Sequence, residues 1–441
     1  MYDAPMSDKC RVWLSLWVWV LASMISPEET HAAEGLKAGA ARVEITPGTN
    51  LSNWITHKPY GEILEPIYTR AVVLEHSGKR IAMVSWELLY PMEGAAARAR
   101  DAIQKKTGIK AGDIMVTATH NHSAPWSPVY GDPLTQAEQK VLDSFLTDPA
   151  YPAWAQKLID STAQAVASAV ENLKPVTLSI SRAYVGDVMF NRRPIKPDGS
   201  VQTLTSATEV YALPSGLRYG RVDPTLTLLL LRDEQGRTVA SLYHTALHAV
   251  VAYPKYDGVC GDWHGPVSAA LANELGGESI FLQGCAGDIN PVRRGLDARD
   301  QISRTIIDRA LKAARVTHPL SLTNDFRVAS TIVKAPVKES LRAELGREHL
   351  PCEIQAITCG ELAIVSLPGE PLSALSHEIL ERSPFAHTIV LGYSNGLGVQ
   401  YVGMPGDRAR GGYEMGVRSL GADECGRLLV DAAVELLRKP L

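Results

Sequence analysis

The chain has 441 residues, of which 45% are hydrophobic and 21% are charged, and its formal net charge is -4 at pH 7. This is the composition of an ordinary globular protein that can bury a large core. The sequence has no run of basic residues and no excess of positive charge, which excludes the usual electrostatic basis for nucleic-acid binding.

The N-terminal residues have the pattern of a secretory signal peptide. Lys9 and Arg11 precede an apolar stretch at residues 12–25, and the small residues Ala32 and Ala33 follow it. The stretch is short for a bilayer span, and a membrane anchor is the alternative interpretation. We predict that residues 1–33 are a signal peptide and that residues 34–441 form a mature domain. This domain is expected to be exported, to the periplasm or out of the cell.

Strand-like runs alternate with helical patterns along the rest of the chain. Apolar or alternating runs predict strands at residues 41–45, 68–74, 81–86, 114–119, 176–185, 225–231, 238–247, 280–282, 354–367 and 388–393. Apolar residues at helical spacing predict helices at residues 154–170, 301–314 and 424–437. Residues 186–222 are expected to form a long irregular excursion. The predicted fold class is α/β, with mixed sheets and flanking helices in a single large catalytic domain, and with a metal site on strand-end loops.

Two histidines follow the predicted strand at residues 114–119. In an extended segment, His120 and His122 would point their rings to the same side. Converging imidazoles suit a metal ion or a polarised carbonyl, since imidazole is a common metal ligand. The alternative is a surface loop that holds two histidines by chance.

A second pair of histidines, His244 and His248, lies at the end of the predicted strand at residues 238–247. Gly261 and Asp262 follow, just before a predicted helix at residues 266–273. Either histidine could instead be a buried core residue, because histidine is often partly buried.

Glycines and a carboxylate follow two later strands. Residues 283–291 are rich in glycine, which allows either an anion-binding nest of N–H groups or a tight turn. Glu370 ends the next strand in the sequence Pro-Gly-Glu. Its charge could serve a site or could simply favour the N-terminus of the helix that follows.

Taken together, these segments resemble the neutral/alkaline non-lysosomal ceramidase family. The resemblance runs in order over nearly all of the mature chain. Its motifs are residues 41–47 (ARVEITP), 119–125 (THNHSAP), 191–194 (NRRP), 222–224 (VDP), His248 with 261–262 (GD), 286–291 (AGDINP), 368–370 (PGE) and 411–414 (GGYE).

The resemblance implies a single zinc (Zn2+) site formed by His120, His248, Glu370 and Tyr401. His248 rather than His244 is implied, because it keeps the family's interval to the Gly-Asp pair. Tyr401 is the tyrosine of the late loop, although the interval from Asn395 is one residue longer than in the family. Imidazole and carboxylate groups are ordinary zinc ligands, and an open position leaves room for water.

The implied reaction is attack of zinc-bound hydroxide on an amide carbonyl. We expect His122 and Arg192 to hold the developing oxyanion. Asn290 stands where the family has the serine of a Gly-Asp-x-Ser-Pro motif. An asparagine amide can donate to an oxyanion or hold a water, but it cannot act as an alcohol nucleophile. The zinc-hydroxide route therefore fits this sequence, and a serine acyl-enzyme route does not.

The expected function is that of an exported zinc-dependent amidohydrolase that cleaves ceramide or a related N-acyl lipid. The partner is then a small-molecule or lipid amide, and a lipid substrate would bring the protein into transient contact with a membrane surface. The C-terminal immunoglobulin-like domain of larger ceramidases is expected to be absent. The alternatives are a zinc hydrolase of another amide or ester, and a non-catalytic metal- or lipid-binding relative. The sequence indicates no particular oligomeric state.

Overall fold

The computed structural model describes residues 35–130, 143, 147–207, 212–321, 326–416 and 418–439. The predicted signal peptide at residues 1–33 lies outside the described residues. Within the described ranges, no helix combines the length and the apolar character needed to cross a membrane.

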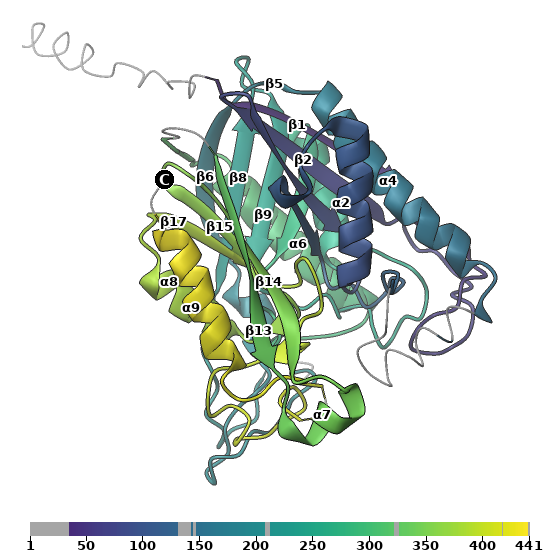
Figure 1. The fold of residues 1–441 in the computed structure, drawn as a ribbon, viewed down its shortest axis with the longest axis vertical. Coiled ribbons are helices and arrows are strands. Elements are labelled where there is room, and N and C mark those ends of the chain that lie inside the picture. The colour runs from purple at the N-terminus through teal and green to yellow at the C-terminus, as the bar shows by residue number, and fades with distance from the viewer. Residues whose placement is uncertain are drawn as a thin grey trace, which may run out of the picture.

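The first sheet has the strand order β4-β3-β2-β1-β5. β3 and β4 are parallel, and the other pairs are antiparallel. Helices α2 (Glu93–Thr107) and α4 (Tyr151–Glu171) cover one face of this sheet, as Figure 1 shows. The strands are β1 (Lys37–Glu44), β2 (Tyr68–His76), β3 (Lys79–Trp86), β4 (Ile114–Ala118) and β5 (Lys174–Pro175).

The second sheet has the order β10-β9-β8-β6-β12, and only β9 and β10 are parallel. Helices α5 (His264–Leu275) and α6 (Leu296–Ala313) pack on its outer face. The strands are β6 (Thr177–Tyr184), β8 (Thr225–Arg232), β9 (Thr238–Thr245), β10 (Glu278–Gln283) and β12 (His318–Pro319).

The third sheet has the order β13-β14-β15-β17, in which β15 and β17 are parallel. Helices α8 (Ser373–Arg382) and α9 (Cys425–Arg438) pack on its outer face, and α7 (Glu339–Leu345) follows β13. The strands are β13 (Arg327–Pro336), β14 (His349–Cys359), β15 (Leu362–Ser366) and β17 (His387–Leu391). Two short pairs complete the described sheets: β7 (Met189–Asn191) with β11 (Ile289–Pro291), and β16 (Glu370–Pro371) with β18 (Tyr401–Val402).

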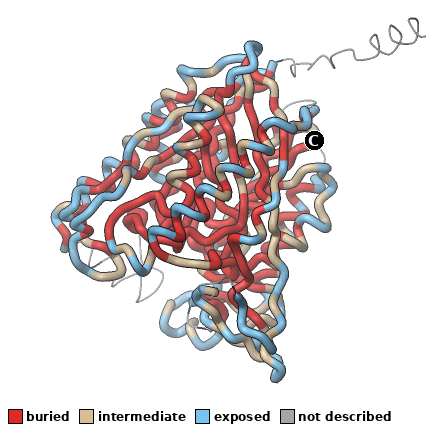
Figure 2. Tube along the Cα trace, turned by 180° about the vertical axis from the view of Figure 1, so that it is seen from behind, coloured by how far each residue is buried: buried red, intermediate tan, exposed pale blue. Residues whose placement is uncertain are grey.

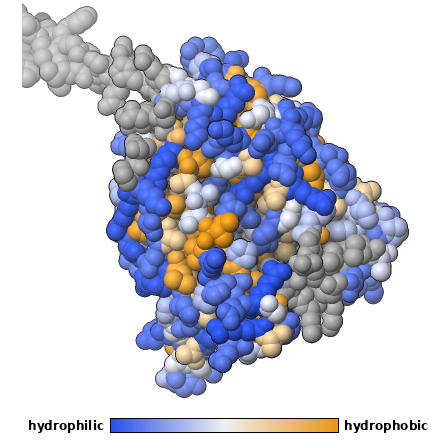
Figure 3. Space-filling view, in the orientation of Figure 1, coloured by the Kyte–Doolittle hydropathy of each residue, from blue (hydrophilic) through white to orange (hydrophobic). Residues whose placement is uncertain are grey.

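The inner faces of the three sheets share one apolar core, to which Val72, Leu242 and Ile364 each contribute from a different sheet. Alternate residues of the same strands point outward to the helices, as Val73 does in β2. Because both faces are buried, these strands have nearly continuous apolar sequences. Figure 2 shows the buried strands inside an exposed outer layer. The face seen in Figure 3 is mainly hydrophilic, with a smaller group of apolar side chains near its centre.

Each of the three main sheets has one parallel strand pair, and the carboxyl ends of these pairs meet at one place. Thr117 of β4 forms a bridge with Ser394, which follows β17. Gly284, directly after β10, forms a bridge with Leu391 of β17. Loops that leave three different sheets are thereby brought together, which is where an α/β protein commonly carries its functional residues.

The predicted α/β class with mixed sheets and flanking helices is confirmed. One predicted strand is wrong in detail, because residues 354–367 contain the end of β14 and the whole of β15. Gly360 makes the turn between them with a φ of 55°. Helix α2 gave no signal because it is rich in alanine and charged residues. β13 gave none because most of its residues are only half-buried or exposed.

Candidate metal centre

Three histidine side chains converge where the parallel strand pairs end. His120 Nε2 lies 3.0 Å from His248 Nε2 and 3.2 Å from His122 Nε2. His120 and His248 are buried, and His122 is half-buried. One ligand atom from each residue lies within 4.8 Å of the others, so the group could hold a metal ion.

The backbone that presents the first two histidines is a turn. β4 ends at Ala118, and His120 has a left-handed conformation with a φ of 60°. The prediction that an extended segment aligns His120 with His122 is therefore wrong in its reason. The rings nevertheless meet edge to face, with centroids 4.8 Å apart, because the turn brings them together.

Hydrogen bonds at Nδ1 orient two of the three rings. His120 Nδ1 donates to Leu89 O at 3.0 Å, and His248 Nδ1 donates to Ala286 O at 2.8 Å. A carbonyl can only accept, so Nδ1 carries a proton in both rings, and the neutral form of each ring would have its lone pair on Nε2. A metal-binding histidine usually has such a second hydrogen bond. His122 Nδ1, in contrast, has no hydrogen-bond partner among the described residues.

The Glu370 carboxylate completes the group on its third side. Its Oε2 lies 3.2 Å from His120 Nε2 and 3.7 Å from His248 Nε2. This buried oxygen has no hydrogen-bond donor among the residues described. An acceptor oxygen that faces two acceptor nitrogens is unfavourable unless a cation lies between them. The donor set therefore fits a metal ion.

The pKa shifts of these side chains also favour a metal site. Burial, together with repulsion from His120, lowers the pKa values of His122 and His248 well below the ordinary value. Burial raises the pKa of Glu370, but the attraction of His120 and the hydroxyls of Tyr401 and Tyr90 more than offset it, so this pKa is lowered. At neutral pH, His122 and His248 are therefore neutral imidazoles and Glu370 is an ionised carboxylate, which are the forms that bind metals.

Three tyrosines surround the carboxylate and His120. Tyr401 of β18 pairs with Glu370 of β16, and its hydroxyl accepts a hydrogen bond from Arg192 Nη2 at 2.9 Å. Tyr90 donates to Glu370 Oε1 from the loop after β3. Tyr393 stacks on His120 with ring centroids 4.2 Å apart. Sequence reasoning assigned no role to Tyr90 or Tyr393, and their only signal was a position just after a buried strand.

Arg192 is held from behind by Asn290. Arg192 Nη1 donates to Asn290 Oδ1 at 3.2 Å, and Arg192 Nη2 donates to Gly287 O at 2.7 Å. Asn290 Nδ2 donates in turn to Thr205 O at 2.8 Å. The Arg192 Nε also lies 2.8 Å from the Glu414 carboxylate. Asn290 thus lies one layer behind the arginine, and its described contacts position the guanidinium.

A cavity of about 580 Å3 opens beside the group. Aromatic side chains form much of its wall, and His122 and Tyr253 stack within it with centroids 5.5 Å apart. Asn290 is not among the residues that line it. The lining residues are Trp54, Ile55, Leu89, Tyr90, His122, Trp126, Arg192, Thr203, Leu204, Thr205, His248, Val250, Tyr253, Arg294, Glu370, Gln400, Tyr401, Tyr413 and Arg418.

Two solved structures share this architecture. The neutral ceramidase from Pseudomonas aeruginosa superposes with a TM-score of 0.70 at 16% sequence identity, over 92% of this chain and 75% of that chain. A structure described as ceramidase complexed with C2 superposes with a TM-score of 0.68 at 16% identity, over 92% of this chain and 77% of that chain. The chain has the neutral ceramidase fold. The resemblance read from the motifs is therefore confirmed for the fold, although no protein-family model and no curated protein matches the sequence.

In this ceramidase fold, the structure separates the second pair of histidines. His248 lies beyond the end of β9 and faces His120, as described above. His244 lies within β9, and its Nδ1 is 3.1 Å from Leu282 O, outside the group. Of the seven candidate site residues, six lie at or on the cavity and Asn290 lies behind it.

The aspartates of the two Gly-Asp motifs fix loops and do not face the cavity. Asp262 accepts hydrogen bonds from the main-chain N–H groups of Val251, Ala252 and Trp263 at 2.8–3.1 Å. Its carboxylate therefore closes the loop after His248. Burial raises the pKa of Asp262, although the three N–H donors act in the opposite direction.

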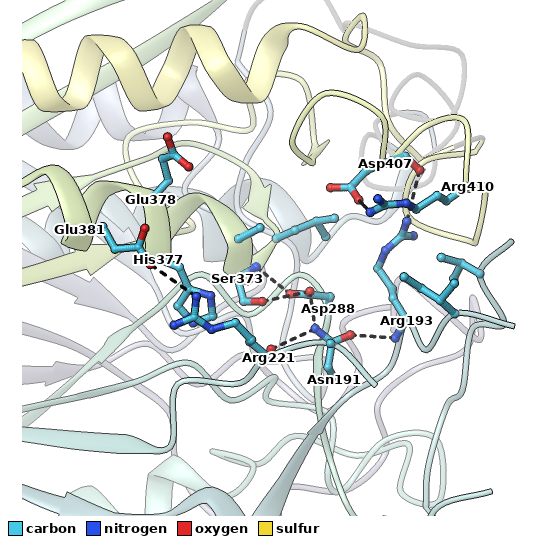
Figure 4. A pocket seen from close by; sticks show the side chains of 15 residues that line it. Asn191, Arg193, Arg221, Asp288, Ser373, His377, Glu378, Glu381, Asp407 and Arg410 are labelled. Atoms are coloured by element: carbon cyan, nitrogen blue, oxygen red, sulfur yellow. Dashed lines mark hydrogen bonds and ion pairs between the residues drawn. The ribbon is translucent and has the colours of Figure 1, made fainter. Parts of the chain in front are cut away.

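Asp288 has the same role at a second, smaller cavity, shown in Figure 4. Its carboxylate accepts from the Ser373 N–H at 2.7 Å, from Ser373 Oγ at 3.0 Å and from Asn191 Nδ2 at 2.7 Å. It thereby ties the loop of Arg192 to the start of α8. The preceding Gly287 is required for a close approach, since a Cβ there would lie 2.7 Å from Glu370 O.

Proposed function

We propose that the protein is an exported zinc-dependent amidohydrolase that cleaves an N-acyl amide, such as ceramide or a related N-acyl lipid. One observation carries the proposal. The Nε2 atoms of His120 and His248 and an unpaired oxygen of Glu370 converge beside a cavity, in a chain with the ceramidase fold.

His120, His248, Glu370 and Tyr401 are the residues that would hold the metal. Three nitrogen and carboxylate ligands with a fourth oxygen are typical of zinc sites in exported enzymes rather than of soft thiolate sites. When bound, zinc supplies the Lewis acidity that activates water for attack on a carbonyl. The second hydrogen bonds to Leu89 O and Ala286 O keep the two imidazoles in the tautomer that such binding needs.

His122 and Arg192 act on the substrate. Arg192 is fixed by Asn290, Gly287 and Glu414, so its charge is placed in the cavity wall before a substrate arrives. A fixed positive group there stabilises the negative charge that develops on the carbonyl oxygen. His122 is neutral at pH 7 and its Nδ1 has no described partner, so its tautomer is free to change. Its Nε2 can therefore donate to the same oxygen or pass a proton to the leaving nitrogen.

Asn290 is a positioning residue in this proposal. Its amide is engaged with Arg192 and Thr205, and it has no group able to form an acyl ester. Hydrolysis then involves no covalent intermediate at this position, in contrast to a serine-based route.

The test combines metal analysis with a substrate panel. The protein purified without its first 33 residues is assayed for bound metals and for hydrolysis of an N-acyl amide and of the matching ester, before and after chelation and zinc addition. We expect close to one zinc per chain and amide hydrolysis that is lost with the chelator and restored by zinc. A chain that binds no metal and hydrolyses neither substrate contradicts the proposal. Hydrolysis of the ester alone would show that the protein is an esterase and not an amidase.

A further inference from the structure

The described residues that line the cavity carry more positive than negative charge. Among the described residues, three arginines line it, namely Arg192, Arg294 and Arg418, and Glu370 is the one acidic residue of the lining. Glu370 attracts Arg192, but its unpaired oxygen faces the two imidazoles and is the proposed metal ligand. A divalent cation in the centre would make the cavity more positive still.

Of the three arginines, Arg294 has a half-buried positive charge with no carboxylate in hydrogen-bond contact among the described residues. Its Nε donates to Thr205 O at 3.0 Å and its Nη1 donates to Tyr253 O at 3.4 Å. Both partners are neutral carbonyls, and among the described residues its Nη2 has no acceptor. The Asp262 carboxylate attracts Arg294 without a hydrogen bond to it, because main-chain N–H groups already occupy that carboxylate. Burial and repulsion from Arg192 lower the pKa of Arg294 to about 10, so the half-buried guanidinium is still charged at pH 7.

The other two arginines add to this excess. One carboxylate, Glu414, lies 2.8 Å from Arg192 Nε and 2.6 Å from Arg193 Nη1, so it is shared by two guanidinium groups. Arg418 is exposed and lies over the Tyr413 ring at 5.8 Å. The positive charge of the wall is thus built from residues far apart in the sequence.

We propose that the substrate carries an anionic group close to the scissile amide and that Arg294 binds it. This inference rests on the proposed amidohydrolase function and narrows its substrate class to anionic N-acyl amides, which replaces the neutral lipid ceramide by a related compound that carries an anionic group. A guanidinium matches a carboxylate or a phosphate with paired N–H groups, and such bonds are strong where water is partly excluded. A neutral amide would leave Arg294 without a hydrogen-bonded counter-charge in the cavity.

The first experiment compares matched substrates of the zinc-loaded protein. The same acyl chain is attached to glycine (a carboxylate), to O-phosphoethanolamine (a phosphate) and to ethanolamine (neutral), and kcat/KM is measured for each. We expect at least one anionic compound to exceed the neutral one by tenfold or more, with a preference that weakens as salt is added. The ratio of the two anionic compounds identifies the favoured group. Equal values, or preference for the neutral compound, overturn the inference.

Calorimetric binding of the same compounds tests the inference separately from turnover. If none is hydrolysed but an anionic one binds at least tenfold more tightly than the neutral one, the anion site stands and the proposed function fails. If neutral compounds are hydrolysed and bind as tightly as the anionic ones, the function stands and the anion site is wrong.

Variants then assign the preference to Arg294. Arg294→Gln should lower the anionic-to-neutral ratio of kcat/KM roughly tenfold to a hundredfold, as loss of a charge-assisted hydrogen bond does. Arg294→Lys should retain part of the preference, because the charge remains and the paired geometry is lost. Arg304→Gln makes the same charge change at an exposed position on α6 and should leave the ratio unaltered. If Arg294→Gln lowers both rates equally, Arg294 is structural and the inference is overturned.

Discussion

At the scale of single residues, the partner of Nδ1 distinguishes the three histidines. His120 and His248 have their Nδ1 atoms fixed by main-chain carbonyls, whereas His122 does not. We expect His120→Ala and His248→Ala to lose most bound metal and activity together. His122→Ala should keep its metal and lose activity, because it removes a group that acts on the substrate.

Metal content per chain, measured by mass spectrometry beside kcat, checks this prediction. His244→Ala is the matched control, because His244 lies on the same strand and outside the group. If His122→Ala loses as much metal as His248→Ala, His122 is a ligand and the assignment must change.

Asn290 provides a second prediction at this scale. Asn290→Ala removes the acceptor that fixes Arg192 Nη1, so we expect kcat to fall about tenfold to a thousandfold, by analogy with the loss of an oxyanion donor. Metal content should be unchanged, because the described hydrogen bonds of the Asn290 side chain go to Arg192 and Thr205 and not to a candidate ligand. Asn290→Ser should leave the fold intact and should form no trapped acyl-enzyme, since position 290 lies behind the cavity. A covalent acyl adduct on the wild-type protein would refute the role assigned to it.

His264 provides a third prediction, about acid stability. Both ring nitrogens are buried without a hydrogen-bond partner in the described ranges, and the ring stacks on Phe281. Burial lowers the pKa of His264 well below its usual value near 6.5. Below about pH 6.5, His264 therefore binds a proton in the unfolded chain but stays neutral in the folded chain. The free energy of unfolding falls as the pH drops through this range.

His264→Phe removes this term and keeps an aromatic ring. We expect the wild-type protein to lose up to about 1.4 kcal/mol per pH unit more than the variant between pH 6.5 and pH 5.5. Denaturant unfolding of both proteins at these two pH values measures the difference. Parallel pH profiles would show that His264 is not buried as a neutral ring.

The sequence predicted the composition of the site better than its geometry. Short motifs after strands drew attention to His120, His248 and Glu370, and the family resemblance implied their roles and that of Arg192. The sequence could not show the left-handed turn at His120, because a single positive φ on a non-glycine residue leaves no sequence pattern. Nor could it show Tyr90, whose contact with Glu370 joins two residues 280 positions apart.

At the scale of elements, the aspartates of the Gly-Asp motifs, Asp262 and Asp288, fix loops by hydrogen bonds. Asp288→Asn would place an NH2 group against donors, because both carboxylate oxygens accept hydrogen bonds from Ser373 or Asn191. Each buried donor left unpaired costs about 1–3 kcal/mol. We expect the free energy of unfolding to fall by about this amount, and kcat to fall because the Arg192 loop is no longer tied to α8.

Urea unfolding and kinetics of the variant check this prediction. Asp308→Asn is the control, because Asp308 is exposed on α6 and its described ion pair is with the exposed Lys312. A variant of Asp288 as stable and as active as the control would mean that the hydrogen bonds at the start of α8 are dispensable.

At the scale of the whole molecule, the sequence predicted the α/β class because strand and helix periods alternate along it. It could not predict which strand ends meet, because that depends on pairings between distant segments. Thr117 with Ser394 and Gly284 with Leu391 are such pairings, and they bring the three sheets to one point. The collinear motifs of the family resemblance supplied this information indirectly.

Three of the four proposed metal ligands follow strands of three different sheets. His120 follows β4 of the first sheet, His248 follows β9 of the second, and Glu370 follows β15 of the third. An ion held by all three would bind the folded chain and not the unfolded one, so its removal should destabilise the whole molecule. At a metal concentration a hundred times the dissociation constant, the loss is about 2.7 kcal/mol, which lowers Tm by a few degrees in a protein of this size.

Calorimetric scans before and after chelation, with metal content measured on each sample, test this last prediction. Restoring zinc should restore Tm, because binding is reversible and linked to folding. The His248→Ala variant is the control, since it lacks a ligand and should show the lower Tm with or without the chelator. An unchanged Tm in a wild-type protein shown to have lost its metal would mean that the ion, wherever it binds, does not join the three sheets. The convergence of His120, His248 and Glu370 would then need another explanation.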